Sequence, residues 1–154
     1  MHIVMFEPQI PPNTGNVART CVATDTILHL VKPLGFSIED RDLKRAGLDY
    51  WEHLDLRLHD RLEEVIEEAQ QANADFYFFT KFGKTKYTDI TYRTNDYLIF
   101  GKETTGLPDF VHEQYPERGL RMPMGPRMRS LNLSNTVAIA LYEALRQLDF
   151  PHLS

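Results

Sequence analysis

Short apolar runs alternate with amphipathic segments along the chain, and this pattern predicts the secondary structure. The runs HIVMF, ILHLV, FYFFT and YLIF are short and rich in β-branched or aromatic side chains, which predicts buried strands. They cover residues 2–6, 27–31, 76–80 and 97–100. Weaker patterns predict further strands at 54–58 and 119–122.

Two of the intervening segments carry a clear helical stripe. Apolar residues recur at i, i+3, i+4 and i+7 within 60–72, and a comparable stripe runs along 134–148. Further helices are expected at 13–25, with Asn13 or Thr14 as the cap, at 39–46 and at 108–114. Because strands and helices alternate, we expect an α/β fold, a mostly parallel sheet with helices on both faces. Ligands of such sheets bind beyond the carboxyl ends of the strands.

The length and composition narrow the class of protein. The chain has 154 residues, which fits a single domain over 1–154 that folds without a disulfide or metal. Its one cysteine, Cys21, has no neighbour at metal-ligand spacing. No apolar run approaches the roughly 20 residues of a membrane span. The N-terminus lacks the basic region and cleavage site of a signal peptide, so we expect a cytoplasmic protein.

The net charge of −5 lies in one segment. Residues 60–75 contain six acids and one base, giving 1 − 6 = −5, and the rest of the chain balances 16 bases against 16 acids. The acidic total therefore does not argue against a nucleic-acid partner. It predicts one acidic helix that faces solvent, away from such a partner.

Two polar loops that follow predicted strands carry candidate chemistry. In EPQIPPNTGNVAR, prolines stiffen the exit from the strand, and Arg19 projects from the helix that follows. Arginine can hold a phosphate with its planar fork, although an ordinary connection with a surface arginine has the same pattern. In FGKETTGLP, Gly101 and Gly106 permit close backbone approach to a ligand. Glu103 is expected to accept backbone N–H bonds that hold the loop, with a catalytic role as the alternative. A simple polar turn is the alternative there.

A third loop, RMPMGPRMRSLNLSN, precedes the last helix. Its arginines Arg121, Arg127 and Arg129 have no acid near them in the sequence between 118 and 129. Four hydrogen-bonding residues follow: Ser130, Asn132, Ser134 and Asn135. Helix capping accounts for one or two of them. The remainder, together with the arginines, indicates a binding site.

Together the motifs PxIPPNTGN..R.C, GxETxGLP and MP(x)5RSLNLSN..A..LYE resemble the SPOUT superfamily of RNA methyltransferases. Within it, the chain is similar to the small TrmL-type (YibK-like) enzymes, and the resemblance covers essentially the whole chain. It implies a deep trefoil knot in the C-terminal third, S-adenosylmethionine (AdoMet) as cofactor, and a homodimer with the last helix at its interface. The implied reaction methylates the ribose 2'-hydroxyl of cytidine or uridine 34 in the tRNA anticodon loop, with leucine tRNAs as expected substrates and no metal.

The resemblance also implies roles for single residues. Arg19 would act at the 2'-hydroxyl, with Asn13 and Asn135 holding it or the ribose. An arginine with a pKa above 12 is an awkward general base, so the acceptor of the proton stays open. Tyr142 would position the target, or pack in the core or the interface. Cofactor contacts are implied for Phe79, Thr80, Gly101, Gly106, Met122, Ser130, Leu131 and Ser134.

Contacts with tRNA are expected from basic side chains, because phosphate contacts supply most nucleic-acid affinity. The candidates are Arg129, Arg127, Arg121, Lys81, Lys84 and Lys86. Three aromatic residues among the lysines, Phe82, Tyr87 and Tyr92, would stack on unpaired bases or pack on the sheet.

Three other functions are alternatives to this hypothesis. A related enzyme would methylate ribosomal RNA or another tRNA position. A non-catalytic RNA-binding module would have lost the glycine loop or Arg19, and both are present. A nucleotide-binding oxidoreductase would carry a glycine-rich turn after the first strand, where Pro11 and Pro12 stand instead.

Overall fold

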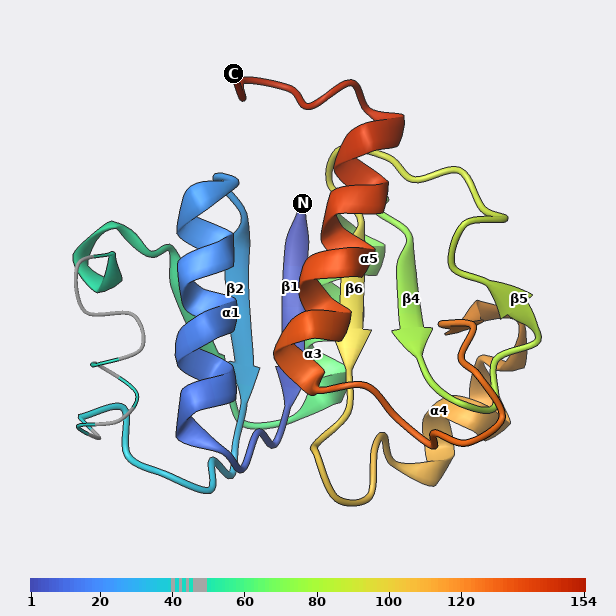
Figure 1. Ribbon diagram of the computed structural model, residues 1–154, viewed down its shortest axis with the longest axis horizontal. Helices are drawn as coiled ribbons and strands as arrows, with labels where there is room; N and C mark the ends of the chain where they lie inside the picture. The colour runs from blue at the N-terminus through green and yellow to red at the C-terminus, as the bar shows by residue number, and fades with distance from the viewer. Residues whose placement is uncertain (40, 42, 44, 46–49) are drawn as a thin grey trace.

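The computed structural model describes the whole chain except residues 40, 42, 44 and 46–49. Seven strands form one sheet in the order β3-β2-β1-β6-β4-β7-β5, and every pair is parallel (Figure 1). The strands are β1 (His2–Phe6), β2 (Ile27–Val31), β3 (Leu56–His59), β4 (Phe76–Phe79), β5 (Thr85–Lys86), β6 (Tyr97–Phe100) and β7 (Gly119–Arg121). The predicted α/β fold is thus confirmed, with a sheet that is parallel throughout.

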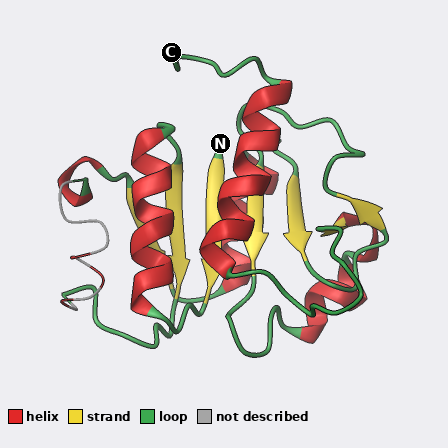
Figure 2. Ribbon diagram, viewed as in Figure 1, coloured by secondary structure: helices red, strands yellow, loops and turns green. Residues whose placement is uncertain are grey.

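Helices cover both faces of the sheet (Figure 2). They are α1 (Pro11–Ala23), α3 (Leu62–Gln71), α4 (Asp109–Gln114) and α5 (Leu133–Gln147), with 3₁₀ turns at Trp51–His53 and Pro116–Arg118. Helices α1 and α5 lie on one face and α3 and α4 on the other (Figure 1). Side chains alternate accordingly along β1: Ile3 and Met5 join the core under α1 and α5, whereas Val4 joins the core under α3.

The predicted helices and strands match the observed ones to within about two residues at most ends. The two-residue strand β5 is too short to give a sequence pattern, and the helix expected at 39–46 lies partly outside the described residues. In α3, the predicted apolar stripe is buried and consists of Leu62, Val65, Ile66 and Ala69. Among the described residues, none of the helices combines the length and apolarity needed to cross a membrane.

The predicted cap of α1 is wrong. The helix begins at Pro11, with Ile10 at the N-cap and no side-chain cap bond. Prolines at the first two positions lack the N–H groups that a cap would satisfy, and their fixed φ suits the first turn. Asn13 therefore lies inside the helix, and its side chain is available for other partners.

Candidate functional site

Three loops meet around a cavity of about 700 Å³ at the carboxyl edge of the sheet. Its size lies within the roughly 300–1,000 Å³ of small-molecule sites. The cavity lies beyond β6, β4 and β7, which are neighbours in the sheet. Seven of the eight residues predicted to bind a cofactor line it: Phe79, Thr80, Gly101, Gly106, Met122, Ser130 and Leu131. The fold thus brings together, around one cavity, predicted residues that are up to 52 positions apart in the sequence, from 79 to 131.

The loop after β6 closes tightly on itself through its two glycines. Lys102 and Gly106 form an antiparallel bridge, with the Gly106 N–H donating to the Lys102 carbonyl at 3.0 Å. A Cβ atom at Gly101 would lie 2.6 Å from the Gly106 Cα and 2.5 Å from the Leu107 nitrogen, so only glycine fits. Gly106 has a φ of +74°, which other residues adopt at a cost. Both positions therefore favour glycine, Gly101 because a Cβ atom has no room there and Gly106 because its φ is positive.

Glu103 fastens this loop to the loop after β1. Its Oε2 accepts the Gln9 N–H at 2.9 Å, and its Oε1 accepts the Ile10 N–H at 3.1 Å. A second bond joins the same two loops: the Thr104 hydroxyl donates to Gln9 Oε1 at 2.7 Å. The predicted structural role of Glu103, as an acceptor of backbone N–H bonds, is confirmed.

Asn13 joins all three loops. It is 7% exposed, its Nδ2 donates to Glu103 Oε1 at 3.4 Å, and its Oδ1 accepts from Asn132 Nδ2 at 3.1 Å. Asn132 in turn caps α5, accepting the Ser134 N–H at 2.9 Å and the Ser134 hydroxyl at 2.6 Å. Ser134, the eighth predicted cofactor residue, is therefore bonded to the cap and does not line the cavity. Sequence reasoning counted Asn132 among four polar residues that cap the helix or belong to a binding site, and it missed the bond of Asn132 to Asn13.

Three residues implied in catalysis lie away from this cavity on the exposed faces of α1 and α5. Arg19 is exposed, with its guanidinium 5.0 Å from the centre of the Tyr50 ring. It stands six positions after Asn13, which on a helix is about 9 Å along the axis and roughly 240° around it. Asn135 is exposed, and Tyr142 is 46% exposed. A single chain therefore does not bring Arg19, Asn135 and Tyr142 to the cavity.

Two of the basic residues predicted to contact tRNA line the cavity. Lys81 and Arg129 line it, and the other predicted phosphate contacts, Lys84, Lys86, Arg121 and Arg127, are exposed. Several further residues line the cavity that sequence reasoning did not name as cofactor contacts. Four of them stand inside the motif loops, Lys102, Thr104, Thr105 and Met124, and two follow in α4, Asp109 and His112.

The aromatic residues of this region divide between surface and core. Phe82 is 67% exposed at the cavity, and its ring meets His112 edge-on at 5.2 Å. Tyr92 is only 2% exposed, and its hydroxyl donates to the Tyr87 carbonyl. Burial raises the pKa of Tyr92. The idea that Tyr92 stacks on RNA bases is wrong, because its ring packs into the core; Phe82 keeps an exposed face.

Comparisons with known proteins agree on one group of enzymes. The model of the SpoU rRNA Methylase family matches residues 1–142. A tRNA (cytidine(34)-2'-O)-methyltransferase of Methylovorus glucosotrophus is 49% identical over 149 residues, covering 96% of each chain. A solved structure described as giving insights into the 2-OH methylation of C/U34 on tRNA has a TM-score of 0.90 and 45% identity, covering 96% of this chain and 95% of its own. The SpoU methyltransferase AviRb from Streptomyces viridochromogenes, solved with the cofactor AdoMet, shares the fold: its TM-score is 0.84 at 22% identity, over 97% of this chain and 58% of its own.

Proposed function

This chain belongs to the SpoU rRNA Methylase family, and from that premise we propose that it methylates the ribose 2'-hydroxyl of nucleotide 34 in tRNA. The methyl donor is AdoMet, the acceptor is cytidine or uridine, and leucine tRNAs are the expected substrates. We take the whole chain to act as one catalytic domain in the cytoplasm. The observation that carries the proposal is the three-loop cavity, in a chain that matches enzymes of this specificity along nearly its full length.

The cavity suits AdoMet by size and by construction. The rings of Phe79 and Phe100 stack at 4.6 Å at the strand ends, and the glycine loop next to them brings backbone close to any ligand. When bound, AdoMet supplies a methyl group on a positive sulfur that is already a good leaving group. The residues that would hold it are the seven predicted lining residues. Ser134 would contribute through the cap of α5 rather than by direct contact.

The protein would have to position the ribose 2'-hydroxyl for attack on the methyl group and stabilise the charge that develops in the transition state. Arg129 lines the cavity and would bind an RNA phosphate, and the exposed ring of Phe82 would stack on a base. Asn13 holds the loops together, which fixes the cavity wall. Arg19 would orient the ribose and its phosphate from the exposed face of α1.

Because Arg19 points away from the cavity of its own chain, we place it in the active site of a second copy. The exposed faces of α1 and α5 lie side by side on one surface, which also carries the apolar side chains of Ile139 and Tyr142, 42% and 46% exposed (Figure 1). A homodimer through this surface would cover both side chains and combine one cavity with the partner copy's arginine. Asn135 and Tyr142 would then lie at the shared site.

We also propose that the segment 122–132 passes through the loop 81–96 and so forms the trefoil knot. The support is that α5 is tied to that loop: Gln147 Nε2 donates to the Ile90 carbonyl at 3.1 Å, and its Oε1 accepts the Tyr92 N–H at 3.0 Å. A crystal structure tests this directly, since its trace takes 122–132 either through the loop or around it.

The activity is tested by mapping 2'-O-methyl groups at nucleotide resolution in tRNA from cells that lack the gene. We expect the modification at position 34 to disappear and to return when the purified protein and AdoMet are added. An unchanged position 34 would contradict the proposed specificity. Loss at another tRNA or ribosomal RNA position would assign the enzyme to that site instead.

The shared site is tested by mixing two impaired variants, Arg19→Ala and Gly101→Ala, at an AdoMet concentration that fills the wild-type cavity but not the Gly101→Ala cavity. The first keeps its cavity and the second keeps its arginine. If the sites are shared, mixed dimers restore roughly a quarter of the wild-type activity, since half of the dimers carry one complete site each. If each chain uses its own Arg19, mixing restores nothing. Sedimentation of the wild-type protein at micromolar concentration should show a dimer.

A further inference from the structure

Three histidines form a hydrogen-bonded row under α3, on the face of the sheet opposite to α1 and α5. His2 Nδ1 lies 2.8 Å from His29 Nε2, and His29 Nδ1 lies 2.8 Å from His59 Nε2. They come from the adjacent strands β1, β2 and β3. His29 is fully buried and His2 is 9% exposed. Nothing in the proposed methyl transfer uses this row.

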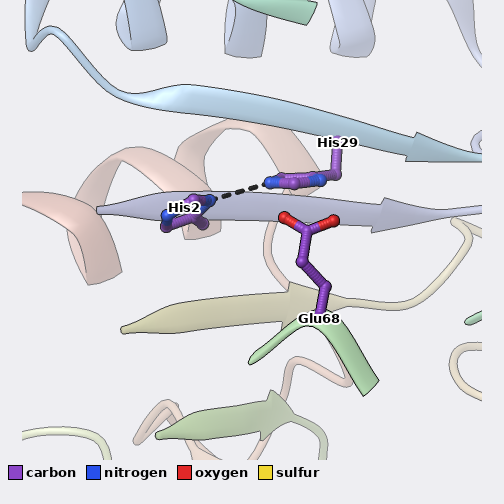
Figure 3. A group of neighbouring side chains, drawn as sticks. All are labelled: His2, His29 and Glu68. Carbon is purple, nitrogen blue, oxygen red and sulfur yellow. Dashed lines mark hydrogen bonds between the residues drawn. The ribbon is translucent and has the colours of Figure 1, made fainter. Parts of the chain in front are cut away.

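Glu68 of α3 adds a carboxylate to the first two histidines. Figure 3 shows its oxygens directed toward the rings of His2 and His29, and one ligand atom from each of the three residues lies within 4.8 Å of the others. Glu68 Oε1 accepts the Tyr97 hydroxyl at 2.8 Å and Arg57 Nη1 at 3.4 Å. Within the described part of the chain, Oε2 has no hydrogen-bond partner, so this oxygen is available for another ligand.

We propose that His2, His29 and Glu68 bind a divalent transition-metal ion, with Zn²⁺ as the ion that best suits the donor set. Two imidazole nitrogens and one carboxylate oxygen are a known three-ligand set for Zn²⁺, with water in the fourth position. Imidazole also suits copper, nickel and iron, whereas magnesium, calcium and manganese prefer sites made only of oxygen ligands.

The proposed ligands accept or donate further hydrogen bonds that would orient them, as ligands in known metal sites do. A ligating histidine usually donates its other ring N–H to an acceptor, which fixes the tautomer. His59 Nε2 is in place to accept from His29 Nδ1, and this bond would leave the lone pair of His29 Nε2 for the metal. His59 Nδ1 lies 4.0 Å from Glu64 Oε2, which extends the row to a carboxylate. Tyr97 orients the carboxylate of Glu68 in the same way.

The site is close to binding geometry without being fully formed. Ligand nitrogens about 2.0–2.1 Å from a tetrahedral zinc lie about 3.3 Å apart, so His2 and His29 must separate by about 0.5 Å. His2 lies in β1 and its ring stacks on that of Tyr97 with centroids 4.0 Å apart, so the side chain has to make the shift against this contact. Burial lowers the pKa of His2 to about 3 and that of His29 to about 4, so both rings are neutral at pH 7. The charge of Arg57 opposes a cation, but Asp55 lies 3.4 Å from its Nε and offsets part of that effect.

A metal here would join β1, β2 and α3, at a distance from the cofactor loops. Its effect would be on stability, because an ion that binds only the folded chain stabilises it by mass action. The proposal does not depend on the proposed function, since methyl transfer needs no ion in this place.

The test uses the full chain without a tag, stripped of metal with a chelator. Zn²⁺ is titrated in competition with a coloured chelator, and the melting temperature is measured with and without the ion. We expect one Zn²⁺ per chain and a higher melting temperature with the ion. Glu68→Gln should lower the affinity at least tenfold and remove the thermal effect, whereas Glu67→Gln, on the exposed side of the same helix, should bind as the wild type does.

Two results would overturn the proposal. One is the absence of Zn²⁺ binding by the wild-type chain, which would leave the histidines as a purely structural row. The other is equal binding by the Glu68→Gln and Glu67→Gln variants, which would place the ion elsewhere, for example at the exposed His53. The Glu68→Gln change lies on a helix and keeps the side chain's shape, so both variants should fold. Far-ultraviolet circular dichroism checks that they do.

Discussion

The cofactor cavity and the histidine row lie on the same sheet and are built in different ways. The cavity is made by loops, and each loop carries a compact motif whose residues are neighbours in sequence. The histidine row is made by register: three strands and one helix each contribute one residue, spread from His2 to Glu68. Loops that follow strands gather chemistry in short segments, whereas strand pairing gathers it from distant parts of the chain.

The two regions therefore should respond differently to substitution. Changes around the cavity should alter cofactor binding or methyl transfer. Changes around the histidines should alter stability and leave the chemistry intact. The following predictions test that separation, starting with the largest expected effect.

Arg19→Ala should reduce methyl transfer to tRNA by about 100–1,000-fold, the usual loss when a group that stabilises transition-state charge is removed. AdoMet binding should stay unchanged, because Arg19 does not line the cavity of its own chain. Single-turnover rates and equilibrium cofactor binding measure the two quantities separately. Arg61→Ala, an exposed arginine before α3, is the matched control. Full activity in the Arg19 variant would remove this residue from the mechanism.

Gly101→Ala should weaken AdoMet binding at least tenfold, because the new Cβ would collide with the backbone of Gly106 and Leu107 and force the loop open. Gly125→Ala is the matched control in a neighbouring loop, since a Cβ there would meet no atom within 4 Å. Calorimetric titration with AdoMet compares the two. Equal affinities would mean that the tight loop does not shape the cofactor site.

Much of the cavity could be predicted from sequence because its motifs are local and their glycines have a physical reason. The motif residues line the cavity, and Glu103 holds the loops as expected. The cap of α1 was mispredicted because two prolines satisfy the first turn without a side chain. That error hid the hydrogen bonds of the Asn13 side chain to Glu103 and Asn132, which are 90 and 119 positions away.

No local sequence pattern indicates the histidine row, because its members come from three separate strands. His29 lies in the apolar run ILHLV and His2 in HIVMF, so each looks like an isolated polar residue in a buried strand. Only the pairing of Val4 with His29, and of Val31 with His59, brings the three rings together. Register of this kind is set by the whole sheet and cannot be read from one strand.

Stability should depend on pH through the histidines. Burial lowers the pKa of His29 to about 4 and that of His2 to about 3, from about 6.5 in the unfolded chain. Between these values the unfolded chain binds more protons, so the free energy of unfolding should fall as the pH drops from about 6.5 to about 4. The slope is at most about 1.4 kcal/mol per pH unit for each histidine.

Urea unfolding at pH 7 and pH 5, in buffer with a chelator, measures this dependence. His2→Gln should make it shallower, and His53→Gln, at an exposed position, should leave it unchanged. The groups that face the row, Glu68, Arg57 and His59, are present in all three chains and do not confound the comparison. A His2→Gln chain with the wild-type slope would assign the pH dependence to other groups.

The smallest effect is expected from Tyr97→Phe, which removes the hydroxyl that bonds to Glu68 Oε1 at 2.8 Å. The free energy of unfolding should fall by about 1 kcal/mol, the usual net value of one hydrogen bond. Tyr115→Phe is the matched control, because its ring packs edge-on against Phe76 and, among the described residues, its hydroxyl has no hydrogen-bond partner. Methyl transfer should be the same in both variants and in the wild type. If Tyr97→Phe instead slowed the reaction at unchanged stability, the histidine side of the sheet would be coupled to the cofactor side, and the separation between the two regions would be lost.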